Sequence, residues 1–212
     1  RRSSDLGAAC ETIDRWILSR LAQTVKASTE AFERYEYADA LDATNQFFWA
    51  DFCDNYLELI KKRVYNEDGS ATPAAQQSAV RTLYYVLDGI LKLYAPFTPH
   101  VTEELYAHIF ADAYAARGSI HTQGQWPTAE DYTVDATALT AGDEALEVLT
   151  AIRNAKSTNN VSIKFPVKQL TVASSYTLAQ RWAADVCGAG NVQAWAQGDA
   201  TGVTLAEAAD AA

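Results

Sequence analysis

Residues 47–63, FFWADFCDNYLELIKKR, form the stretch with the broadest apolar helical pattern in the chain. Two rows of side chains recur at steps of three or four residues: Phe48, Phe52, Tyr56, Leu59 and Arg63, and beside them Trp49, Cys53, Leu57 and Ile60. An apolar face this wide packs against several neighbours at once. The stretch therefore predicts the central strut of a helical bundle, with Phe48, Trp49 and Phe52 in the core.

The chain before this stretch predicts a second helix that packs against it. A helix begins near Glu11, after a polar lead-in at residues 1–10, and carries Leu18, Leu21 and Val25 on one face. Residues 35–37 read as a turn. The helix that contains the opening stretch then runs from Tyr37 to Val64, which is long for a globular protein.

The chain after this stretch carries two clear helix starts. Thr72-Pro73 and Thr98-Pro99 each place a hydroxyl side chain before a proline, as the first turn of a helix favours. The first of these helices ends at Ala95, because Pro96 disfavours helical backbone in the residue before it. The second is expected to bury Val101, Leu105 and Ile109. Residues 119–127 read as an extended segment that lays Ile120 and Trp126 against the bundle.

The pattern changes in the last third of the chain. Residues 128–142 are a linker by composition, and a helix opens at Asp143. Residues 168–173 alternate as a strand does, residues 176–187 are helical, and residues 192–196 and 202–205 are strand candidates. The sequence thus predicts a mainly α fold: an up-down helical bundle (residues 1–127), a linker (128–142) and a small α/β appendage (143–212).

Composition limits what the chain can bind. Its 212 residues fit one large domain or one domain with an appendage. A formal charge of −10 argues against general affinity for nucleic acid, so any RNA contact must be local. Three widely spaced cysteines favour a reduced, cytoplasmic setting. The sequence shows no signal peptide and no membrane span. The lack of methionine suggests a segment of a longer chain.

Catalytic motifs are scarce. The three histidines, His100, His108 and His121, have no partner set for catalysis or metal binding, so capping or surface roles are favoured. Glu103 and Glu104 suit the first turns of a helix on electrostatic grounds alone. No P-loop, GxGxxG or nucleophile elbow occurs. We therefore expect no catalytic residue and no metal ligand in this chain.

Four segments, taken in order, resemble the region that follows the catalytic core of class I aminoacyl-tRNA synthetases. They are ETIDRWILSRL (11–21), YADALDATNQFFWADFCDNYLELIKKR (37–63), LYAPFTPHVTEELY (93–106) and SIHTQGQWP (119–127). Within this class the chain looks most like valyl-tRNA synthetases, because of Phe52-Cys53-Asp54, Tyr56-Leu57-Glu58 and Lys61. The resemblance covers roughly residues 12–127 and, more weakly, 152–172.

The resemblance implies an anticodon-binding bundle in a cytoplasmic, monomeric enzyme that joins valine to tRNA-Val with ATP. The catalytic and editing domains of that enzyme would lie elsewhere in the parent chain. Residues 156–160, KSTNN, are not a KMSKS loop, and the HIGH signature is absent. We expect the segment to be inactive alone and to hold no cofactor. The family also reads anticodon bases from a helix before the one at Glu11, and that helix is not in this sequence.

Eight basic residues are the candidates for contact with tRNA: Arg15, Arg20, Lys61, Lys62, Arg63, Arg153, Lys156 and Lys164. The triplet 61–63 is the densest basic spot and could touch two phosphates, although a solvated helix end is the favoured explanation for it. Arg153 and Lys156 share a helix face, with Lys164 and Lys168 following, and are the better phosphate candidates in an acidic chain. Arg15 and Arg20 match family positions, but each has a structural alternative: packing at a domain junction or pairing with an acid.

Two other interpretations remain open at this point. The chain could belong to an isoleucyl or leucyl enzyme, which shares most of the four segments. It could also be a helical scaffold that binds a protein partner through the apolar face around Phe52. That interpretation requires an exposed apolar patch.

Overall fold

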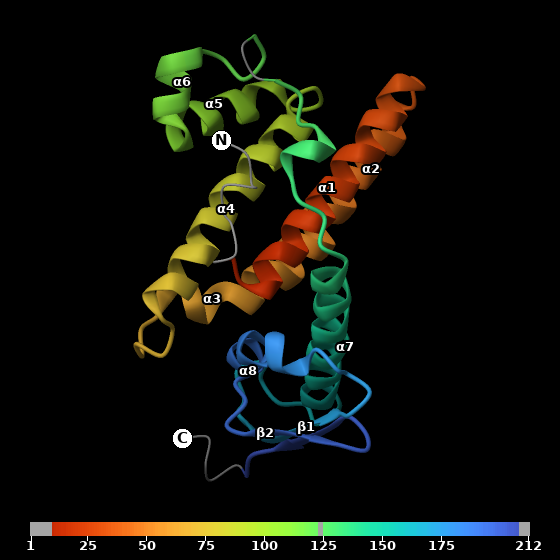
Figure 1. Cartoon of the computed structure of the whole chain (residues 1–212), viewed down its shortest axis with the longest axis vertical. Helices are drawn as coiled ribbons and strands as arrows, with labels where there is room; N and C mark the ends of the chain where they lie inside the picture. Colours follow the sequence, from red (N-terminus) through yellow and green to blue (C-terminus); the bar gives the residue numbers. More distant parts are fainter. Residues whose placement is uncertain (1–9, 123–124, 208–212) are drawn as a thin grey trace.

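A computed structural model describes residues 10–122 and 125–207, so most of the expected lead-in at residues 1–10 lies outside the described residues. The bundle contains α1 (Thr12–Glu33), α2 (Tyr37–Gln46), η2 (Phe47–Tyr56), α3 (Leu57–Tyr65), α4 (Pro73–Tyr94), α5 (Pro99–Ile109) and α6 (Ala111–Arg117). The remainder contains η3 (Ala129–Asp131), α7 (Ala136–Thr158), β1 (Val167–Ala173), η4 (Ala179–Arg181), α8 (Ala183–Gly190), β2 (Trp195–Gly198) and β3 (Gly202–Leu205). The predicted helical bundle with a small α/β appendage is confirmed (Figure 1).

Residues 37–65 follow one continuous helical path, as predicted, but its middle part, η2, has the wider turns of a π-helix. In a π-helix, residues five apart lie on one face. Phe47 and Phe52 are accordingly both buried, while Trp49 is 60% exposed and Phe48 is only partly buried. The prediction of Trp49 as a core residue is therefore wrong, because it assumed ordinary α-helical spacing.

The helix at the centre of the bundle is α1. It packs against α2, η2 and α4 on the bundle side and against α7 on the other. Its side chains Ile13, Trp16, Ile17 and Leu21 are fully buried. The stretch 47–63 is thus one of several helices around α1, and not the central strut.

Helix α5 buries a different face from the predicted one. Thr102, Tyr106 and Phe110 point inward, whereas the predicted row of Val101, Leu105 and Ile109 is exposed. The inward face packs on a second small core formed by Leu91, Ala95, Tyr106, Phe110 and Ile120. Both rows, 101/105/109 and 102/106/110, have four-residue spacing. The buried row is the one with the larger aromatic surface, because burying that surface is more favourable.

The described residues of the segment predicted as extended, 119–122 and 125–127, lie against the bundle as predicted, although 120–122 form a turn; residues 123–124 lie outside the described residues. Ile120 belongs to the second core, and Trp126 meets Phe32 edge to face at 5.2 Å between ring centroids. The indole nitrogen of Trp126 also donates a hydrogen bond to the hydroxyl of Thr29 at 2.8 Å.

Helix α7 begins at Ala136, within the predicted linker. Asp135 caps it by accepting a hydrogen bond from the backbone nitrogen of Ala138 at 3.0 Å. The first turns carry few large apolar residues because they press small residues against α1: a methyl group at Gly142 would overlap the Trp16 indole ring. Close contact between helices, and not a flexible connection, explains this composition.

The appendage is a three-stranded sheet in the order β2-β1-β3, with β1 parallel to β2 and antiparallel to β3. The predicted strands are confirmed, while the predicted helix at 176–187 is split into η4 and α8. Helix α8 connects the parallel strands and packs on both α3 and α7. Figure 1 shows α7 extending from the bundle to the sheet, at the opposite end of the molecule from α5 and α6.

Candidate nucleic-acid interface

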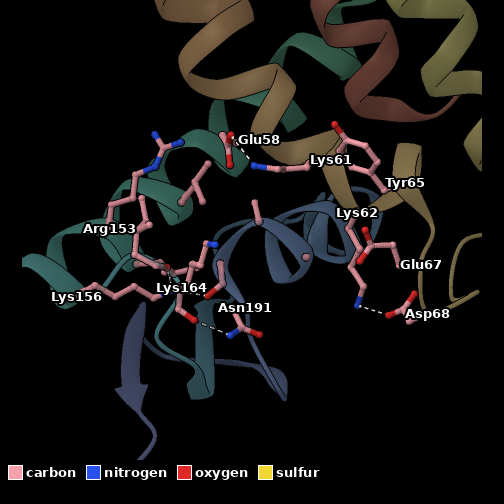
Figure 2. A pocket seen from close by; sticks show the side chains of 16 residues that line it. Glu58, Lys61, Lys62, Tyr65, Glu67, Asp68, Arg153, Lys156, Lys164 and Asn191 are labelled. Carbon is pink, nitrogen blue, oxygen red and sulfur yellow. Dashed lines mark hydrogen bonds and ion pairs between the residues drawn. The ribbon is translucent and has the colours of Figure 1, made fainter. Parts of the chain in front are cut away.

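A cavity of about 720 Å³ lies where α3, α7, the following loop and the end of α8 meet. It is lined by basic residues from two distant parts of the sequence: Lys61, Lys62, Arg153, Lys156 and Lys164 (Figure 2). Three acidic residues, Glu58, Glu67 and Asp68, also line it. Five cations and three carboxylates leave a surplus of two positive charges in a chain whose net charge is −10.

Lys61 and Lys62 lie at the exposed edge of this cavity. The ammonium of Lys61 is 3.4 Å from the Glu58 carboxylate, and that of Lys62 is 3.1 Å from the Asp68 carboxylate. Hydrogen bonds from Ser70 and Lys62 lower the pKa of Asp68 to about 2. Exposed ion pairs of this kind contribute little to stability. Both lysines can therefore exchange their carboxylate for a phosphate at small cost.

Arg153 is held by neutral acceptors. Its guanidinium donates to the side-chain oxygen of Asn55 at 2.9 Å and to the backbone oxygen of Asp54 at 2.7 Å. Across residues 10–122 and 125–207, neither Arg153 nor the exposed Lys164 forms an ion pair with a carboxylate. The positive charges of these two residues are thus available to an anion.

Lys156 is the one buried cation of the cavity wall, with 2% of its surface exposed. Its ammonium donates to the backbone oxygens of Ile163 and Gly190, each at 2.7 Å. Burial lowers the pKa of Lys156. These hydrogen bonds tie the loop after α7 to the end of α8, so Lys156 shapes the cavity and adds charge beneath it.

Arg63 does not reach the cavity. It is 9% exposed and lies between Asp14 of α1 and Asp185 of α8, with nitrogen–oxygen distances of 2.7–3.2 Å. One further hydrogen bond goes to the backbone oxygen of Ala75 at 3.1 Å. An arginine has five N–H donors, and all five are used here. The expected phosphate contact of Arg63 gives way to a structural role, because no donor is left for a ligand.

The acids around Arg63 form a buried network that sequence reasoning missed. Asp14 also accepts hydrogen bonds from the hydroxyls of Tyr56 and Ser78. The network thereby joins α1, η2, α3, α4 and α8. One signal was available in the sequence: Asp14 precedes Leu18 by four residues and so falls on the inward face of α1. A carboxylate on a buried face requires a buried partner.

The buried network predicts a pH dependence. Burial raises the pKa of Asp185 from 3.8 to about 6, against the opposing effect of Arg63. A carboxyl group with a raised folded-state pKa contributes stability that is full below about pH 4 and lost as the pH rises through about 6. The wild type should therefore lose up to about 3 kcal/mol relative to Asp185→Asn between those limits. Urea unfolding of both proteins across this pH range measures the difference, and parallel curves would contradict it.

Arg15 and Arg20 do not line the cavity; they pair with Asp135, the N-cap of α7, and with Asp143, two turns into that helix. Arg15 is 3.4 Å from Asp135, and Arg20 is 2.5 Å from Asp143. These contacts agree with the structural alternatives for both residues. The structure thus gathers five of the eight candidate residues at one cavity and places Arg15, Arg20 and Arg63 between helices.

The described part of the chain, residues 10–122 and 125–207, offers little for metal chemistry or membrane insertion. No group of three or more histidine, cysteine or acidic side chains is arranged there to hold a metal ion. None of the described helices is long and apolar enough to cross a membrane. His108 pairs with Glu104 on the surface, and the ring of His121 bonds the backbone oxygen of Pro99.

Comparison with known proteins gives consistent matches. Residues 14–172 match the family model described as the anticodon-binding domain of tRNA ligase. A valine–tRNA ligase of Wolbachia sp. subsp. Brugia malayi is 40% identical over 170 residues, covering 80% of this chain and 19% of the relative. One from Ehrlichia ruminantium is 38% identical over 192 residues, covering 89% and 23%. One from Rickettsia felis is 42% identical over 162 residues, covering 76% and 18%. The chain spans about a fifth of the length of these relatives.

Proposed function

Because this chain belongs to the family of anticodon-binding domains of tRNA ligases, we propose that it is the tRNA-binding part of a valine–tRNA ligase. The names of the relatives support valine over isoleucine or leucine. In this proposal the parent enzyme charges tRNA-Val with ATP through domains outside this segment, and the segment alone does not charge tRNA. Three free cysteines suit a cytoplasmic enzyme. Charging assays of the full-length parent with each of the three amino acids test the assignment.

The observation that carries the proposed interface is the grouping of basic side chains at one cavity. Lys61 and Lys62 reach it from α3, Arg153 from α7 and Lys164 from the next loop (Figure 2). Phosphate contacts position RNA and require cations whose charge is not already compensated. Arg153 and Lys164 meet this requirement, and the lysine pairs at the cavity edge are weak. We assign the sugar–phosphate backbone of the anticodon arm to this surface.

The scaffold interpretation has less support. It requires the face around Phe52 to be exposed, but Phe52 is 7% exposed and packs in the main core. Phe52 therefore already packs against other helices of this chain and does not offer an exposed apolar surface to a partner protein.

Neutralising the edge of the cavity tests the interface. The variant with Lys61, Lys62, Arg153 and Lys164 changed to glutamine should bind tRNA at least about tenfold more weakly, because several phosphate contacts are lost. The slope of log affinity against log salt should fall by about 1 for each contact removed. Binding titrations of this chain with tRNA-Val transcript at several salt concentrations give both quantities.

A control variant of similar charge separates local contact from net charge. Lys26, Arg34 and Arg81 are exposed and lie outside the cavity, so their change to glutamine makes the chain more acidic without touching the proposed surface. This variant should keep most of the affinity and the salt slope. Equal losses in both variants would show that binding follows net charge, and unchanged binding in the cavity variant would overturn the proposed interface.

A further inference from the structure

The dipeptide Asp-Gly occurs twice in this chain, as Asp68-Gly69 and as Asp88-Gly89. An aspartate before glycine is chemically labile, because glycine has no Cβ and its backbone nitrogen can approach the side-chain carboxyl group. The first pair lies in the loop between α3 and α4, and the second lies inside α4. The fold thus places the same labile dipeptide in two different environments.

The backbone at Asp68-Gly69 is free to rearrange. Both residues are exposed, and a methyl group added to Gly69 would have no atom within 4 Å. The nitrogen of Gly69 donates a hydrogen bond to the backbone oxygen of Asn66 at 3.1 Å, in an exposed loop where water can replace it. The nitrogen can therefore turn toward the Asp68 side chain at small cost.

The backbone at Asp88-Gly89 is not free to do so. Gly89 is buried, and a methyl group there would lie 2.7 Å from the hydroxyl of Tyr132 and 2.8 Å from Leu21. Ring closure would require Asp88 to leave helical backbone angles within the 22-residue helix α4 and so break its hydrogen bonds. Asp88 is also ion-paired, 2.7 Å from Lys92. An ion pair is thus common to both sites, and the freedom of the backbone distinguishes them.

Two neighbours hold the Asp68 carboxylate (Figure 2). Its Oδ1 accepts a hydrogen bond from the backbone nitrogen of Ser70 at 3.0 Å, and its Oδ2 lies 3.1 Å from the Lys62 ammonium. The hydrogen bonds from Ser70, and then the contact with Lys62, keep the pKa of Asp68 at about 2. A carboxylate is a poor electrophile, and the protonated carboxyl group is the form that a nitrogen attacks. Both contacts therefore restrain the reaction by keeping Asp68 ionised.

We propose that Asp68-Gly69 is an isoaspartate-forming site of the folded chain and that Lys62 restrains its conversion. The nitrogen of Gly69 bonds to Cγ of the protonated Asp68 side chain, and the side-chain hydroxyl leaves with the proton of that nitrogen as water. Water then attacks the former main-chain carbonyl of the cyclic imide and breaks its bond to the nitrogen. The backbone now runs through Cβ and Cγ, with no change in mass and no other reactant.

The product alters the link between α3 and α4. It lengthens this link by one carbon atom and withdraws the carboxylate from Ser70 and Lys62. Lys62 then keeps its charge at the edge of the cavity without the Asp68 partner. This chemistry proceeds whether or not the chain binds RNA.

Peptide mass spectrometry follows both sites in one sample. Trypsin releases Asp68 within residues 64–81 and Asp88 within residues 82–92, and electron-transfer fragmentation distinguishes aspartate from isoaspartate. On prolonged incubation of the folded chain near neutral pH, isoaspartate should accumulate at Asp68 and not at Asp88. In urea both sites should convert at similar rates, because unfolding removes the difference between their backbones.

Matched variants test the role of Lys62. Lys62→Gln should convert Asp68 about threefold faster, because loss of the ion pair raises the protonated fraction of the carboxyl group. Lys61→Gln changes the neighbouring exposed lysine, which pairs with Glu58, and should convert Asp68 at the wild-type rate. Conversion of Asp88 identifies any variant that unfolds. Equal rates at Asp68 in the wild type and a folded Lys62→Gln, or equal conversion of Asp68 and Asp88 in the folded chain, would overturn the proposal.

Discussion

Replacing Arg63 by methionine should lower the free energy of unfolding by about 3–5 kcal/mol. The substitution leaves Asp14 and Asp185 buried without a cation, and removing one partner of a buried ion pair typically costs this much. It also removes a bridge between α1, α3 and α8. The appendage should therefore loosen from the bundle. Guanidinium unfolding measures the loss, and limited proteolysis of the loop after α7 reports the loosening.

Two comparison variants isolate the cause of this loss. Lys61→Met alters an exposed residue of the same helix and should change stability by no more than about 0.5 kcal/mol. Adding Asp185→Asn to Arg63→Met removes one of the two uncompensated charges, so it should restore part of the stability. A loss below about 1 kcal/mol in Arg63→Met would show that water reaches the two carboxylates, and the buried network would not hold the domains together.

Changing Gly142 to alanine should destabilise the chain by about 2 kcal/mol. In an ordinary helix this substitution gains up to about 1 kcal/mol, because alanine is the better helix former. Here the added methyl group overlaps the rigid indole ring of Trp16, which is fully buried, so the ring can be displaced only by disturbing the core around it. Overpacking of this kind costs about 1–3 kcal/mol or more. The steric cost should exceed the gain in helix propensity. A loss of stability is therefore the expected sign, and a gain would contradict it.

The change should be seen both in stability and at Trp16. Urea unfolding gives the free energy, and the intrinsic tryptophan fluorescence should shift as the indole is displaced. Ala136→Val, at the exposed start of the same helix, is the control and should cost only about 0.5 kcal/mol through helix propensity. If Gly142→Ala stabilises the chain instead, the close approach of α7 to α1 is wrong.

Features governed by neighbouring residues were predictable. Thr72 accepts a hydrogen bond from the backbone nitrogen of Ala75 at 3.2 Å, and α4 begins at Pro73 and ends before Pro96, as the sequence indicated. The strand at 167–173 follows its alternating pattern. Caps, prolines and periodicity act within one or two turns, so the information that fixes them is present in the local sequence.

Features that depend on which face meets a neighbour were not predictable. Val101, Leu105 and Ile109 have the same spacing as the row that is buried on α5, and Trp49 is as apolar as Phe47. The close contact at Gly142 depends on Trp16 of α1, which is 126 residues away in the sequence, and the sequence pattern did not indicate the π-helical turns of η2. A pattern of apolar residues shows that a helix has a buried face, but several rows can satisfy it until the partners are in place.

The sequence by itself determined the class of fold, the order of its helices and strands, and the family through four ordered segments. It also identified the basic residues worth considering. Only the tertiary structure decided which of them act together. Lys61 and Lys164 lie far apart in the chain yet line one cavity, whereas Arg63, two residues from Lys61, is enclosed by Asp14 and Asp185. Charge is a property of each residue, but its availability to a ligand depends on partners that folding brings from distant parts of the chain.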